Sequence, residues 1–154
     1  MKQRSIQGGA SMRKFNQLWI AINFLIFGFN STDLFGACSS YLALGDSYRS
    51  AAEVAAEQAI LIYEKGYKEL EDANDPVACE YLANAYDLYA IAEENLYIST
   101  GEFSKAVKIC GGAQKNLAQV GIDSAQAEMT VVIYFKQLVL NELLYSCPRV
   151  NLQG

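Results

Sequence analysis

The chain has 154 residues, of which 52% are apolar, enough for the core of one domain. It contains no histidine, which excludes histidine-based catalysis and removes the commonest side-chain metal ligand. Residues 1–29 hold four basic and no acidic side chains, so the remainder, with 8 basic and 17 acidic, has a net charge of about −9. Because this charge repels phosphate backbones, a nucleic-acid partner is not expected and a basic protein surface fits better.

The first element has the order of residues found in a secretory signal peptide. Basic residues at 13–14 precede an apolar run at 18–29, and small residues follow at 36–37. The apolar run is twelve residues long and contains Asn23, whereas a membrane-spanning helix needs roughly twenty apolar residues. We therefore predict a signal peptide over residues 1–29, cleaved between 28 and 37, and no stable membrane span after its removal.

Four cysteines follow the predicted signal peptide. If the chain is secreted, they enter an oxidising compartment, where Cys38, Cys79, Cys110 and Cys147 could pair. The small residues in "GAC" also resemble those before the cysteine of a bacterial lipobox. A lipid-anchored bacterial envelope protein, modified at Cys38, is therefore kept as an alternative.

Four helices are predicted from periodicity and turn signals. The first spans about residues 47–72 and ends at "DANDP"; the second begins with Asp75 as N-cap and Pro76 at the first helical position. "STGEF" is expected to close the second helix at Gly101, and the third and fourth are expected at 102–119 and 123–147. Short links between four helices predict an all-α, antiparallel four-helix bundle over residues 30–147, with room for a short N-terminal helical extension and a tail at 148–154.

The expected turn at Gly101 also fixes where the cysteines lie. An antiparallel hairpin folded there separates Cys79 from Cys110 by roughly 18 Å along the helix axis, beyond the reach of a disulfide. We therefore expect these two cysteines not to bond to each other, and single buried cysteines are the expected state. The last helix contains "MTVVIYFKQLVLNELLY", which is apolar nearly all round, so it is expected to be the most buried helix.

No pattern in the chain predicts catalysis or metal binding. Adjacent acids such as Glu93 and Glu94 do not face each other on a helix. "CGGAQKN" follows no strand and is therefore not interpreted as a phosphate-binding loop. We predict no catalytic residue, no metal site and no cofactor, and a protein that is not an enzyme.

Two segments resemble the paired helices of a tetratricopeptide repeat. These are "LANAY" at 82–86 and "GEFSKA" at 101–106. The stretch between them is about ten residues too long, and barely one repeat is found where three are normally needed. A helical interaction scaffold is kept as a second alternative.

A further resemblance covers about residues 29–146. "DPVACEYL" with "LYAIA" is similar to a helix start in the plant invertase and pectin methylesterase inhibitor family, "TGEFSKA" is similar to the turn after it, and "YFKQLVLNELL" to the apolar final helix. The resemblance implies a secreted, monomeric inhibitor in the cell wall, extracellular space or vacuole. Such an inhibitor binds stoichiometrically over the active-site cleft of an invertase or a pectin methylesterase.

The sequence departs from that family at its cysteines. Ala85 and Val120 stand where the resemblance places the second disulfide, and Phe29 stands where it places the first cysteine. The expected hairpin tip is predicted as the partner-binding site, with Phe103 as an exposed aromatic anchor. The alternative is that Phe103 packs beneath the turn. The residues of this predicted site are Glu102, Phe103, Ser104 and Lys105.

Overall fold

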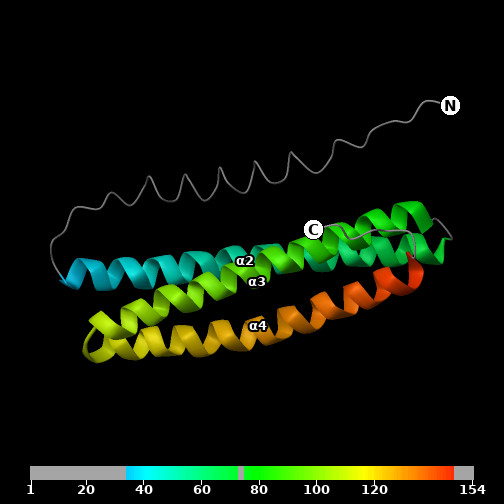
Figure 1. Ribbon diagram of the computed structural model, residues 1–154. Helices are drawn as coiled ribbons and strands as arrows, with labels where there is room; N and C mark the ends of the chain where they lie inside the picture. Colours follow the sequence, from blue (N-terminus) through cyan, green and yellow to red (C-terminus); the bar gives the residue numbers. More distant parts are fainter. Residues whose placement is uncertain (1–33, 73–74, 148–154) are drawn as a thin grey trace. The chain divides into compact units, whose positions relative to one another are not determined.

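The computed structural model describes residues 34–72 and 75–147, and every regular element in these ranges is an α-helix. The helices are α2 (Leu34–Glu71), α3 (Asp75–Ile109) and α4 (Gly112–Ser146), shown in Figure 1. The all-helical prediction is therefore confirmed, whereas the predicted four helices are three within the described ranges. The predicted signal peptide and the tail at 148–154 lie outside the described residues.

Several of the expected helix boundaries are wrong. α3 continues through Gly101, and α4 continues through residues 120–124, where a link was expected. Gly101 is exposed, and a glycine inside a helix costs only about 1 kcal/mol relative to alanine. Burial of Leu96, Phe103 and Ala106 on both sides of it outweighs that cost. α2 also begins earlier than expected, at Leu34 instead of Ser47.

The second turn of the chain lies at Gly111 and Gly112, which were expected inside a helix. Gly112 has a φ of +51°, a left-handed conformation that glycine adopts without the steric cost of a Cβ. Gly111 is extended and caps α4 without a side-chain hydrogen bond. Cys110 still donates its N–H to the carbonyl of Ala106 at 2.8 Å, so the helical hydrogen bonding of α3 ends directly before the two glycines.

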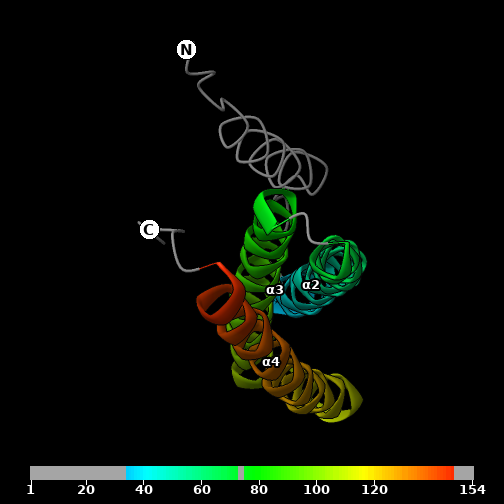
Figure 2. The ribbon, with the colours of Figure 1, turned by 90° about the vertical axis from the view of Figure 1, so that its right-hand side faces the viewer.

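The three helices run back and forth with α3 in the middle. α3 packs along both neighbours, whereas α2 and α4 approach each other at only a few residues, as the end-on view in Figure 2 shows. Each successive pair is antiparallel, so α2 and α4 run in the same direction. The described part of the chain thus lacks the fourth helix that would close a bundle across α2 and α4.

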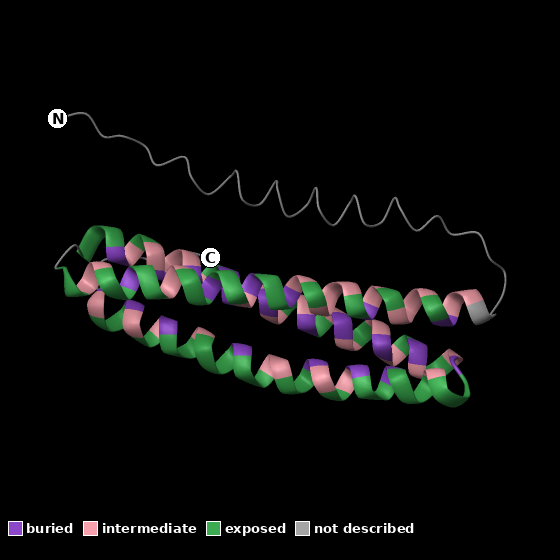
Figure 3. Cartoon of the chain, turned by 180° about the vertical axis from the view of Figure 1, so that it is seen from behind, coloured by how far each residue is buried: buried purple, intermediate pink, exposed green. Residues whose placement is uncertain are grey.

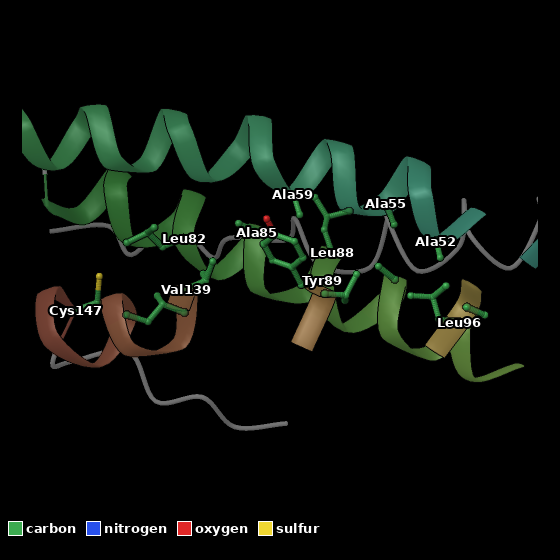
Figure 4. Close-up of a cluster of buried hydrophobic side chains, with 14 residues drawn as sticks. Ala52, Ala55, Ala59, Leu82, Ala85, Leu88, Tyr89, Leu96, Val139 and Cys147 are labelled. Atoms are coloured by element: carbon green, nitrogen blue, oxygen red, sulfur yellow. The ribbon is translucent and has the colours of Figure 1, made fainter. Parts of the chain in front are cut away.

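The helix contacts follow a seven-residue repeat. Apart from Leu88, the buried side chains of α3 fall into two series that repeat every seven residues. The small series is Ala78, Ala85, Ala92, Ser99 and Ala106, and the large series is Leu82, Tyr89, Leu96 and Phe103. The buried Cys110, directly after the helix, continues the second series. α2 presents small buried residues at the same interval, namely Cys38, Gly45, Ala52, Ala59 and Gly66. Ala52 and Ala59 lie on the side of α2 that faces α3 (Figure 4). This repeat is typical of helices that cross at a shallow angle, and the small residues permit close approach of the backbones.

The Phe103 ring of α3 lies beside a glycine of each of the other two helices. A Cβ added at Gly45 of α2 or at Gly121 of α4 would come within 2.7 Å of this ring, so the ring fills the space beside both glycines. One turn away, the hydroxyl of Ser99 donates a hydrogen bond of 2.8 Å to the carbonyl of Gly45. This bond satisfies the only buried polar side chain among the described core residues.

Candidate functional site

Two disulfides close the open ends of the two helix hairpins. Cys38 pairs with Cys110 and Cys79 pairs with Cys147, with Cα–Cα distances of 5.3 and 5.8 Å. Each bond joins the start of one helix to the end of the next, opposite the turn that connects them. No described cysteine is free, so the expected single buried cysteines are wrong, although Cys79 and Cys110 do not bond to each other, as predicted.

One of these bonds, and the continuity of α3, bear on the two alternatives to the inhibitor interpretation. The Cys38 sulfur, which a lipid anchor would require, is already bonded to Cys110. "LANAY" and "GEFSKA" lie on one continuous helix, α3, so they do not form the helix-turn-helix of a tetratricopeptide repeat.

The predicted partner-binding residues lie inside α3 and not at a hairpin tip. Phe103 is 2% exposed and forms part of the core, so the expected exposed anchor is wrong and the alternative that it packs inward holds. Ser104 donates its hydroxyl to the carbonyl of Thr100 at 2.7 Å. Lys105 donates to Glu102 at 2.6 Å, and this hydrogen bond raises the pKa of Lys105. At the surface, therefore, this segment presents an ion pair and no aromatic side chain.

A different surface, along α4, carries more of the exposed large apolar side chains than α2 or α3 does. Leu117, Tyr134 and Tyr145 are 61%, 61% and 88% exposed, and Val120, Val131 and Leu138 are exposed as well. We call this row the α4 seam, because its positions up to Leu138 recur at intervals of three and four residues, as in a helix contact. Its members are Leu117, Val120, Ser124, Ala127, Val131, Tyr134, Leu138 and Tyr145.

The α4 seam is distinct from the face of α4 that packs on α3. The buried positions are Ala118, Gly121, Ala125, Val132, Val139 and Leu143, and Figure 3 shows how much of α4 stays exposed beside them. The helix therefore has two apolar rows, of which the partners within the described chain cover only one. The expectation that this would be the most buried helix is wrong, because the second apolar row has no partner there.

Ring contacts connect Tyr134, in the middle of the seam, to the core of the protein. Tyr134 packs edge-on against Phe135, with ring centroids 5.5 Å apart, and Phe135 stacks on Tyr89 of α3 at 6.1 Å. Tyr89 is buried, and burial raises the pKa of its hydroxyl. The exposed Tyr134 is thus connected through ring contacts to the core, which favours a defined position for it.

Two ion pairs fix α4 against the other helices. Arg49 of α2 donates to Glu128 of α4 at 2.8 Å, and this hydrogen bond raises the pKa of Arg49. Lys136 of α4 donates to Glu93 of α3 at 2.6 Å. Both pairs are partly exposed, so each is worth at most about 1 kcal/mol, and their main effect is on orientation.

Features that would indicate a small-molecule or metal site are weak in the described ranges. A hollow of about 120 Å³ beside Val77, Glu80, Tyr81 and Asn84 is smaller than the roughly 300–1,000 Å³ typical of ligand pockets. No group of three or more cysteine, aspartate or glutamate side chains in residues 34–72 and 75–147 could hold a metal ion. Among the same residues, no helix has the length and apolar character needed to cross a membrane.

Comparisons of the chain with protein-family models, with curated proteins and with solved structures found no match.

Proposed function

We propose that the protein is a secreted inhibitor of a carbohydrate-active enzyme, an invertase or a pectin methylesterase, and that it binds its target through the α4 seam. The observation that carries the binding role is the exposed apolar row on α4. Monomeric soluble proteins rarely expose a continuous apolar surface of this kind unless it contacts a partner. The target class comes from the sequence resemblance described above.

The cross-linked frame supports this proposal. Disulfides persist in oxidising compartments, and the two in this chain favour secretion. The Cys79–Cys147 bond also ties the end of α4 to α3, so less conformational freedom remains to be lost when the seam binds, which favours affinity. Tyr134 and Tyr145 are the strongest anchor candidates, since exposed tyrosines often dominate binding energy.

Charge limits the kind of target surface. The described residues carry seven basic and sixteen acidic side chains, a net charge of about −9. A target with a basic rim around an apolar groove would therefore be attracted at long range. The binding unit is the monomer, with one protomer covering one active site. Glu102 and Lys105 are still proposed as a second contact with the target enzyme. Phe103 is buried and contributes nothing to that contact.

The test is a titration of invertase and of pectin methylesterase with the purified mature protein. We expect activity to fall in proportion to added protein until one equivalent is bound. Tyr134→Ala should weaken inhibition at least tenfold, whereas Tyr97→Ala, which removes an exposed tyrosine from α3, should leave it unchanged. Full activity of both enzymes at excess inhibitor would refute the proposal.

A further inference from the structure

The α4 seam is long enough and regular enough to pair with a whole helix. From Leu117 to Tyr145 it covers 28 residue steps, or about 42 Å at 1.5 Å per residue. A row of this kind with no partner among residues 34–72 and 75–147 is a usual site of helix association. We propose that in the free protein the α4 seam pairs with the same seam of a second copy, antiparallel, around a two-fold axis beside Val131.

The side chains of the seam complement one another under this symmetry. With the axis at Val131, each residue lies opposite one that is about equally far from Val131 along the second copy, so Ala127 meets Tyr134 and Ser124 meets Leu138. Each small side chain thus faces a large one, and Val131 meets itself at the axis. This alternation is what close packing of two helices requires. A parallel pair in register would instead place Tyr134 against Tyr134 and leave Ala127 against Ala127.

The charges beside the seam favour the same arrangement. In the antiparallel pair, Asp123 faces Gln137 and Glu128 faces Phe135 of the second copy, so no carboxylate lies opposite another. In a parallel pair, Asp123 would approach Glu128, whose carboxylate already accepts from Arg49, so the like charges repel only weakly there. The antiparallel contact uses the same residues on both copies, so it closes at two chains and does not extend into a filament.

Self-pairing would also regulate the surface assigned above. Because it covers the seam that the proposed function uses for the target, the dimer is the resting form and the monomer the binding form. Salt should affect the seam–seam contact and the seam–target contact in opposite directions. Two copies of net charge about −9 repel each other, so added salt should tighten the dimer, whereas it should weaken attraction to a basic target.

The first test measures mass in solution without any enzyme, by sedimentation of the mature chain over a range of concentrations. We expect twice the chain mass, and Val131→Glu should weaken the dimer by at least about tenfold, because two carboxylates then meet at the axis. Mixing Val131→Glu with Val131→Lys should restore a dimer. Ile133→Glu is the matched control, since Ile133 is exposed on α4 but outside the seam.

The second test fixes the direction of the pair by disulfide trapping. Ser124→Cys and Leu138→Cys should form a covalent dimer when mixed and little when oxidised alone. Efficient trapping of each variant with itself would mean a parallel pair and would overturn the antiparallel arrangement. Circular dichroism and the mass of the intact native disulfides establish that each variant is folded.

Two outcomes would distinguish a failure of self-pairing from a failure of the proposed inhibitor function. A chain that stays monomeric at every concentration, yet inhibits its target, would reject self-pairing and leave the inhibitor proposal intact. A dimer broken by Val131→Glu, with no inhibition of either enzyme, would confirm self-pairing and reject the inhibitor.

Discussion

The Phe103 ring of α3 lies directly against Gly121 of α4, at a distance that leaves no room for a Cβ. A methyl group at Gly121 would come within 2.7 Å of two ring atoms. A Cβ at Gly45 of α2 would come just as close to the same three ring atoms. One aromatic side chain therefore sets the spacing of all three helices at this level.

Gly121→Ala should consequently destabilise the protein by about 1–3 kcal/mol, the usual cost of overpacking a close-packed core. Gly45→Ala should have a similar effect, for the same reason. Chemical denaturation followed by circular dichroism measures both. An unchanged midpoint for either variant would mean that the ring has freedom to shift.

Gly101→Ala is expected to act in the opposite direction. Gly101 lies within α3, is exposed, and has no other atoms within 4 Å of the place where a methyl group would be added. Alanine should therefore stabilise the helix by up to about 1 kcal/mol. The same denaturation experiment serves here, and destabilisation at this position would indicate that the chain turns at Gly101 after all.

Phe103→Ala distinguishes a core residue from an exposed contact. Because the side chain is 2% exposed, its removal should cost about 3–5 kcal/mol of unfolding free energy. Ser104→Ala, at the neighbouring half-buried position, should change stability far less. If Phe103→Ala left the unfolding midpoint unchanged, the inward packing of this ring would be wrong.

Loss of either disulfide should have nearly the same effect. The bonds enclose segments of similar length, with sequence separations of 72 and 68 residues. The chain-entropy model assigns about 4 kcal/mol to each, and Cys→Ala replacement of a whole pair should reveal this amount. A much larger effect of one pair would show that its hairpin depends on the bond for more than loop closure.

Alkaline pH should lower the stability of the protein through the buried Tyr89. Burial raises the pKa of Tyr89 above its ordinary value of 10.0, so the folded state holds this proton more tightly than the unfolded state. Its contribution to stability is complete below pH 10 and is lost as the pH rises from there through the raised pKa. Denaturation at several pH values should show this loss, and Tyr89→Phe should make it shallower. An identical pH dependence in the variant would rule out Tyr89 as the cause.

Local sequence signals predicted part of this fold. The alanine-rich stretches and the scarcity of proline indicated an all-helical chain, and Asp75 with Pro76 correctly marked the start of α3. Gly101 and the pair Gly111–Gly112 both carry a helix-breaking signal, however. What separates them is the seven-residue repeat, which continues through Gly101 and stops at Cys110. Placing the turn at residues 111–112 would also have brought Cys79 opposite Cys147.

The apolar character of the α4 seam could be predicted from the sequence, but its exposure could not. That the last helix is apolar nearly all round was visible in the sequence, but burial of an apolar row depends on what packs against it. The row through Val132 and Val139 is buried, and the row through Val131 and Leu138 stays exposed within the described ranges. The same apolar composition therefore produced a core on one side of α4 and a candidate binding surface on the other.

The two disulfide-bonded segments interleave, since Cys79 lies between Cys38 and Cys110, and Cys110 lies between Cys79 and Cys147. A protease that cuts any single peptide bond between Cys38 and Cys147 therefore always leaves at least one disulfide joining the two fragments. A nicked chain stays one molecule, and its helices stay at high effective concentration and can remain packed. For the secreted protein proposed above, this order of cysteines along the chain would protect against the first cut by a protease.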